Sequence, residues 1–195
     1  MIATRKIPVL AILLISLAAL PARAQTPTVD TQHSAITIHV FKSGLFSAFA
    51  DNHEVKAPIS EAALDTAKRE VSLKIDTKQL AVLDPDLPPE KRAQVQTRML
   101  GADVLDVQRF PQITFRSSSV ETVGSQRFRV HGDLSLHGVT APVTLDVTEE
   151  NGSYRGHCAL KQSAFGIQPI SIAGGSVKVK DELKIEFTIV MASVK

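Results

Sequence analysis

Apolar and polar residues alternate along this chain in many short runs, and this pattern limits the fold more than any other feature. Successive side chains of a β-strand point to opposite faces, so each run has one apolar and one mostly polar face. An antiparallel sheet that is buried on one side requires such strands. The clearest runs are residues 36–40, 71–75, 128–136, 143–147 and 183–191, with further strands expected at 113–115 and 154–160 and a weaker one at 55–64. The sequence therefore predicts about eight antiparallel strands.

The connections support an all-β fold with one exception. Residues 123–126 and 149–153 have the composition of hairpin turns. Residues 81–88 are predicted to be a loop, and residues 89–100 have the pattern of a short amphipathic helix. Pro89 and Glu90 suit its first turn, and Val95, Met99 and Ala102 follow at helical spacing. We expect this helix to lie against or across the sheet.

The alternation leaves the overall architecture open between two forms. Eight strands with one apolar face each can bury it between two packed sheets or inside a closed barrel. Closure also removes the exposed sheet edges, and an eight-stranded barrel can enclose one small ligand. The pattern of residues does not distinguish these two forms.

The first residues have the three parts of a secretory signal peptide. Arg5 and Lys6 precede the apolar run 9–20, and Ala22-Arg23-Ala24 is a typical cleavage site. The run is too short to span a bilayer, which needs roughly 20 residues. We therefore expect a signal peptide over residues 1–24, cleavage after Ala24, a periplasmic location and a single domain over residues 25–195. We find no transmembrane segment after the cleavage site.

The charge of the expected mature chain gives no indication of a nucleic-acid partner. Three of the 22 Lys and Arg residues lie in the signal peptide, which leaves 19 basic residues against 20 acidic ones. The mature chain has no basic run with interleaved aromatic residues, so nothing in it indicates nucleic-acid binding.

No set of residues indicates catalysis, a metal site or a cofactor. The six histidines include no pair at metal-binding spacing, and no Gly-x-Ser-x-Gly motif is present. Cys158 alternates with apolar residues, so we expect a buried, unreactive thiol, and a single cysteine cannot form an intrachain disulfide. His33 and His137 are expected to be hydrogen-bonded structural residues. An alternative is a metal- or His-dependent hydrolase that uses His33, His53 and a nearby carboxylate.

Four blocks of sequence, in order, resemble the YceI-like family of exported bacterial proteins. They are Asp30-x-x-His33-Ser34, Phe110-Pro111-x-Ile113-x-Phe115, Gly132-Asp133-Leu134-Ser135-Leu136-His137-Gly138-Val139-Thr140, and the closing pair Ala164-Phe165-Gly166-Ile167 and Val179-Lys180-Asp181-Glu182-Leu183. The resemblance covers nearly the whole mature chain. It implies an eight-stranded, lipocalin-like β-barrel whose interior holds a long-chain isoprenoid, such as a quinone tail, or another apolar lipid.

With that fold, the apolar strand faces become candidates for the wall of a ligand cavity. The candidates are Ile36, Ile38, Val40, Phe46, Phe49, Leu73, Phe115, Phe128, Leu134, Leu136, Phe165 and Phe187. Residues 41–54 and 97–103 depart from the family pattern. A solid interior would instead favour a stress-protective protein-interaction module, and a homodimer stays open.

Overall fold

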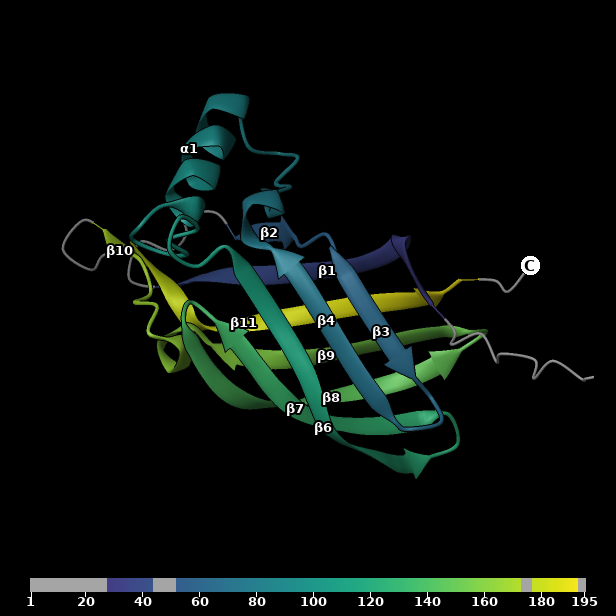
Figure 1. Ribbon diagram of the computed structural model, residues 1–195. Coiled ribbons are helices and arrows are strands. Elements are labelled where there is room, and N and C mark those ends of the chain that lie inside the picture. The colour runs from purple at the N-terminus through teal and green to yellow at the C-terminus, as the bar shows by residue number, and fades with distance from the viewer. Residues whose placement is uncertain (1–27, 44–51, 173–176, 193–195) are drawn as a thin grey trace, which may run out of the picture.

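The computed structural model describes residues 28–43, 52–172 and 177–192, and these residues form one curved antiparallel sheet with one α-helix (Figure 1). The strands are β1 (Val29–Ser43), β2 (His53–Lys56), β3 (Glu61–Asp65), β4 (Glu70–Asp76), β5 (Ala81–Val82), β6 (Gln112–Gly124), β7 (Arg127–Leu136), β8 (Val139–Glu150), β9 (Ser153–Lys161), β10 (Ser171–Ile172) and β11 (Val177–Met191). The helix α1 spans Pro89–Leu100, and two 3₁₀ helices, η2 and η3, span Thr77–Gln79 and Gln162–Phe165.

The strands follow one another around the sheet in the order β3-β4-β6-β7-β8-β9-β11-β1-β2-β5, and β10 pairs with β11. Strands β2 and β3 are consecutive in the chain but lie at different places in this order. Between them, the Ala57 amide donates to the Ile36 carbonyl of β1, and the Ser60 amide donates to the Lys74 carbonyl of β4, each at 2.9 Å. An isolated antiparallel β-bridge between Thr28, just before β1, and Ala63 of β3 also connects these two sides of the sheet. These contacts bring the two sides of the curled sheet together.

The predicted all-β class and the helix at residues 89–100 are confirmed, whereas the count of eight strands is not. Eleven strands are present in the described residues. Each of the eight predicted runs does form strand structure, but the weak run at 55–64 is divided into β2 and β3. The predicted loop at 81–88 begins with β5, which pairs with β2. Strands β5 and β10 have two residues each, too few to show an alternation.

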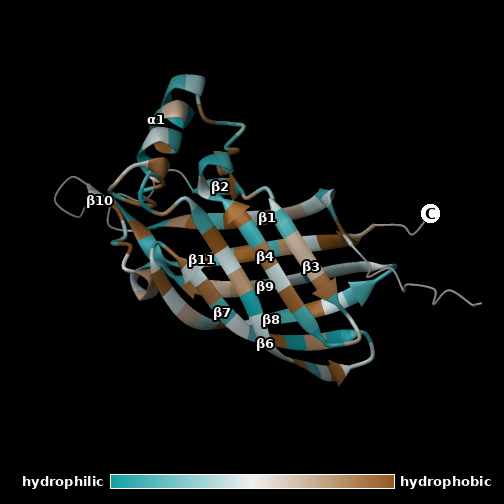
Figure 2. Ribbon diagram, viewed as in Figure 1, coloured by the Kyte–Doolittle hydropathy of each residue, from teal (hydrophilic) through white to brown (hydrophobic). Residues whose placement is uncertain are grey.

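The alternation of the sequence becomes the two faces of the sheet. Figure 2 shows brown and teal residues alternating along strands such as β4 and β6. The buried apolar residues gather on the inner face, where they form one cluster with partly buried neighbours from α1 and the segment that follows it. The polar residues form pairs outside, such as Arg129 with Asp146 across β7 and β8 at 3.0 Å.

The Asp30-x-x-His33-Ser34 block shapes the start of β1. The Asp30 carboxylate accepts hydrogen bonds from the Gln32 and His33 amides and lies 2.7 Å from the His33 ring. These bonds, above all those from His33, hold the pKa of Asp30 below its usual value. Ser34 bonds to the Asp30 carbonyl and accepts from the Val190 amide of β11, across an irregularity in the β1–β11 register. This block therefore has a structural role.

Candidate ligand-binding site

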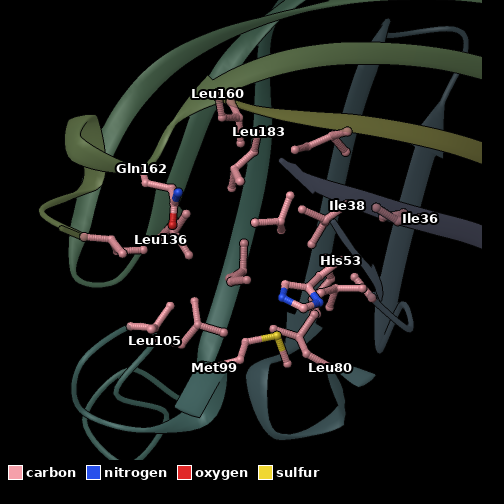
Figure 3. Close-up of a pocket in the computed structure, with 18 of the residues that line it drawn as sticks. Ile36, Ile38, His53, Leu80, Met99, Leu105, Leu136, Leu160, Gln162 and Leu183 are labelled. Atoms are coloured by element: carbon pink, nitrogen blue, oxygen red, sulfur yellow. The ribbon is translucent and has the colours of Figure 1, made fainter. Parts of the chain in front are cut away.

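A cavity of about 790 Å³ lies between the inner face of the sheet and the segments around α1. Figure 3 shows Met99, Leu105 and Leu80 facing Leu160 and Leu183 across this space. The strands of the sheet supply most of the apolar wall: Ile36, Ile38, Val40, Val55, Val71, Leu73, Ile75, Ile113, Phe115, Leu134, Leu136, Val143, Leu145, Cys158, Leu160, Leu183, Ile185, Phe187 and Ile189. Protein interiors are normally close-packed, so an apolar space of this size calls for a specific explanation.

Two glycines on the inner face help to keep this space open. A Cβ atom on Gly132 would lie 2.6 Å from the ring of Phe115, and one on Gly156 would lie 2.5 Å from the ring of Phe187. Each ring therefore covers bare backbone and stays close to the wall. Because both rings line the cavity, the glycines leave more room for an occupant than larger residues would.

Helix α1 covers one end of the cavity, and one of its glutamines attaches it to the backbone around β5. The Gln96 side chain donates to the Leu80 carbonyl and accepts from the Val82 amide, both at 2.7 Å. Val95 and Met99 on the same helix line the cavity. These two bonds thus fix α1 to β5, which is itself paired with β2 at the sheet edge.

The 3₁₀ helix η3 forms another part of the rim. The Asp181 carboxylate of β11 accepts from the Ser163 amide at 2.8 Å and from the Ser163 hydroxyl at 2.6 Å. These bonds hold the pKa of Asp181 below its usual value. Gln162 donates to the Lys180 carbonyl at 2.9 Å, and both Gln162 and Ile167 line the cavity. The closing sequence block therefore holds the rim to the last strand.

Most of the candidate cavity residues lie on this wall. They are Ile36, Ile38, Val40, Leu73, Phe115, Leu134, Leu136 and Phe187. Phe46 and Phe49 lie outside the described residues. Phe165 is 2% exposed and packs in the core cluster rather than on the wall. Phe128 does not line the cavity either; it pairs with Val147, two residues beyond Leu145, which is the last residue of β8 on the wall.

Sequence reasoning missed several residues of the wall. Val143, Leu145, Ile185 and Ile189 follow the same alternation as the candidates, so their strand patterns could have included them. Val95 and Met99 of α1 belong to the apolar helical pattern that predicted the helix, but nothing in that pattern placed them on a ligand cavity. The segment at 104–105 had no such signal.

The structure does not bring His33 and His53 together. His33 bonds to Asp30 near the start of β1, whereas His53 pairs with Val40 near its other end, roughly 23 Å along the strand. His53 lines the cavity, and its Nδ1 lies 2.5 Å from the buried Asp84 carboxylate. Asp84 also accepts from the Glu54 amide. Within the described part of the chain, no group of three His, Cys, Asp or Glu residues is arranged to hold a metal ion.

Two further residues from the sequence analysis have clear surroundings. Cys158 lines the cavity, and burial raises the pKa of its thiol to about 11, so the reactive thiolate is scarce near neutral pH. His137 Nδ1 lies 3.3 Å from the Phe165 carbonyl oxygen, and its ring packs 4.4 Å from that of Phe110. His137 therefore joins the β7–β8 turn to η3. Among the described helices, none is long and apolar enough to cross a membrane.

Comparison with known proteins gives one consistent family. The model of the YceI-like domain matches residues 28–191. A UPF0312 protein of Azotobacter vinelandii is 30% identical over 153 residues, which cover 71% of this chain and 73% of that protein. A UPF0312 protein of Pseudomonas putida is 36% identical over 85 residues, which cover 43% of this chain and 41% of that protein. The chain thus matches less than half the length of the latter relative.

A solved structure agrees on the fold. The crystal structure of Burkholderia cenocepacia BcnA superimposes with a TM-score of 0.63 and 22% identity, covering 85% of this chain and 99% of that one. At this level of identity, the similarity concerns the arrangement of the strands.

Proposed function

Because this chain belongs to the YceI-like family, we propose that its cavity binds a long apolar ligand, an isoprenoid or another lipid, and that the protein carries this ligand in the periplasm. The observation that supports the proposal best is the apolar cavity of about 790 Å³ inside the sheet. Its volume lies in the range of roughly 300–1,000 Å³ that is usual for small-molecule sites.

The chemistry of the wall favours a ligand that is bound mainly through its hydrocarbon. Burial of apolar surface contributes about 25 cal/mol per Å², and a long chain offers much such surface. The sheet contributes almost only aliphatic and aromatic side chains to the wall. The polar residues that line the cavity come mainly from α1, from η3 and from the ends of β1, β2 and β11, which suits a ligand with one polar end.

Filling the cavity tests this proposal. Cys158 points into the cavity, whereas the next residue, Ala159, is exposed on the outer face of β9. Cys158→Phe should reduce the lipid that copurifies with the protein, because the new ring occupies ligand space. Ala159→Phe adds the same ring outside and should leave lipid content unchanged. Lipid is measured by extraction and mass spectrometry, and circular dichroism checks that both variants are folded.

Two results would contradict the proposal. One is an absence of lipid in wild-type protein purified from its own periplasm and after incubation with isoprenoid lipids. The other is a folded Cys158→Phe variant that retains as much lipid as the Ala159→Phe variant. The extraction also identifies the lipid.

Export has a separate test. The segment with Arg5, Lys6 and Ala22-Arg23-Ala24 lies outside the described residues, and its cleavage stays a proposal. Amino-terminal sequencing of protein from the periplasmic fraction should begin at Gln25. Recovery of a chain that still begins at Met1 would show that this segment is not a cleaved signal peptide.

A further inference from the structure

The charged side chains that line the cavity are all positive. They are Lys42, Lys91, Arg98 and Lys178, and no Asp or Glu belongs to the wall formed by the described residues. The composition does not explain this bias, because the whole chain has 22 basic and 20 acidic residues. The charged residues of the lining are therefore biased to one sign.

These cations come from different parts of the chain. Lys91 and Arg98 lie seven residues apart on α1, with Val95 between them, and so share the helix face that lines the cavity. Lys42 and Lys178 lie on adjacent strands, where Lys42 pairs with Val179 and Ser43 with Lys178. Helix and sheet thus each contribute two positively charged residues to the lining of the same space.

Three of the four cations have no carboxylate partner in the described part of the chain. Other lysines do have such partners: Lys74 lies 2.7 Å from Glu61, and Lys184 lies 2.6 Å from Glu186. Lys91, Arg98 and Lys178 form no comparable ion pair within the described residues, and all three are exposed. They remain available to an external anion.

One acid lies beside the cavity, next to His53, and is already engaged. The Asp84 carboxylate does not line the cavity, and it bonds to the His53 ring and to the Glu54 amide. Its hydrogen bond to His53 Nδ1 leaves Nε2 as the second polar atom of that ring on the cavity side. His53 therefore adds a polar contact beside the cations rather than a negative charge.

We propose that the ligand is an amphiphile with an anionic head group, a phosphate or a carboxylate, which Lys91, Arg98, Lys178 and Lys42 bind while the hydrocarbon chain fills the apolar interior. This inference rests on the proposed lipid binding and specifies the class of lipid. Ammonium and guanidinium groups form charge-assisted hydrogen bonds with such heads, and partial exclusion of water strengthens the attraction.

The test compares two probes with the same chain. Hexadecyl phosphate and hexadecan-1-ol, both below their aggregation limits, are titrated into the delipidated protein at low salt. The phosphate should bind at least about tenfold more tightly, since three or four cations each contribute modestly to binding. High salt should reduce this preference, because salt screens exposed charges.

Matched variants locate the effect. The triple variant Lys91→Gln, Arg98→Gln and Lys178→Gln should lose most of the preference for the phosphate and keep its affinity for the alcohol. The control variant Lys56→Gln, Lys78→Gln and Lys161→Gln removes the same charge from exposed positions that do not line the cavity. It should retain the wild-type preference.

The remaining outcomes separate the two proposals. Equal binding of both probes to the wild type would overturn the anionic head group and leave lipid binding intact, whereas failure of both to bind would overturn both proposals. Loss of preference in the control variant would show that net charge, not the cavity cations, is responsible. Inorganic phosphate that displaces hexadecyl phosphate at equal concentration would indicate a free-phosphate site and overturn the inference.

Discussion

Gly132 lies on the inner face of β7, where any side chain would meet its neighbours. A Cβ atom there would lie 2.5 Å from the backbone oxygen of Arg116, which cannot move away as a side chain can. We expect Gly132→Ala to lower the free energy of unfolding by about 1–3 kcal/mol, as overpacking of a core does. Denaturant unfolding measures the change.

Gly124 on β6 is the control for this prediction. A Cβ atom there would meet only the guanidinium end of Arg127, which can rotate away. Gly124→Ala should therefore change stability by less than about 0.5 kcal/mol. If both variants lose the same free energy of unfolding, the loss comes from replacing glycine by alanine in a strand and not from a clash inside the curled sheet.

At the scale of elements, α1 depends on a contact that its sequence does not reveal. Gln96 forms two hydrogen bonds to the backbone around β5, whereas Gln94 lines the cavity without such bonds in the described chain. Gln96→Ala should loosen the helix and leave a buried amide and carbonyl without partners, at a cost of about 1–3 kcal/mol each.

Hydrogen exchange measures this effect. Amides of residues 92–100 should exchange faster in Gln96→Ala, while those of β7 and β8 keep their protection. Gln94→Ala provides the matched control and should exchange like the wild type. Unchanged exchange in the Gln96 variant would show that the other contacts of the helix, such as its apolar packing and the bond from Arg92 to the Asp84 carbonyl, are enough to hold it.

The sequence predicted the elements of this fold better than their connections. Long strands such as β7 and β11 bury one face along their whole length, so the alternation marked them clearly. The run at 55–64 was weak because it contains two strands that pair with different neighbours. Strand β2 pairs with β1 and β3 pairs with β4, and the residues between them cross from one side of the sheet to the other. Strand β5 has only two residues, and its contacts are with β2 and Gln96. Its own sequence therefore could not predict it.

The candidate site was predictable to the same extent. Residues on the inner faces of long strands were placed on the cavity wall, because their burial follows from the alternation. Phe128 follows the same alternation, but nothing in the pattern tells how far along β7 the cavity extends. The cations on α1 were missed, since a helix with an exposed face carries lysine and arginine whether or not it covers a ligand.

At the scale of the whole molecule, the ends of the described chain lie together. The Ala192 amide donates to the Thr28 carbonyl at 2.7 Å, and β1 pairs with β11 from Val29 opposite Met191. A circular permutant that joins residues 28 and 192 by a short linker and begins at Gly152 opens only the β8–β9 turn. It should keep its fold and its lipid, because every strand pair is retained.

Circular dichroism and lipid extraction test this permutant. A second permutant, opened between Gly132 and Asp133, cuts β7 where it pairs with both β6 and β8, and it should fail to fold. If both permutants fold, or if neither does, the position of the cut relative to the strand pairs does not decide whether the protein folds.

The pairing of β1 with β11 also sets an order of events during biosynthesis. Of the described strands, the one that the ribosome makes first, β1, has its longest pairing with the one that is made last, β11. Until β11 arrives, that side of β1 is an open edge that can pair with other chains. Contacts between such distant segments also slow folding. A newly made chain therefore passes through a period in which the unpaired edge of β1 exposes it to aggregation.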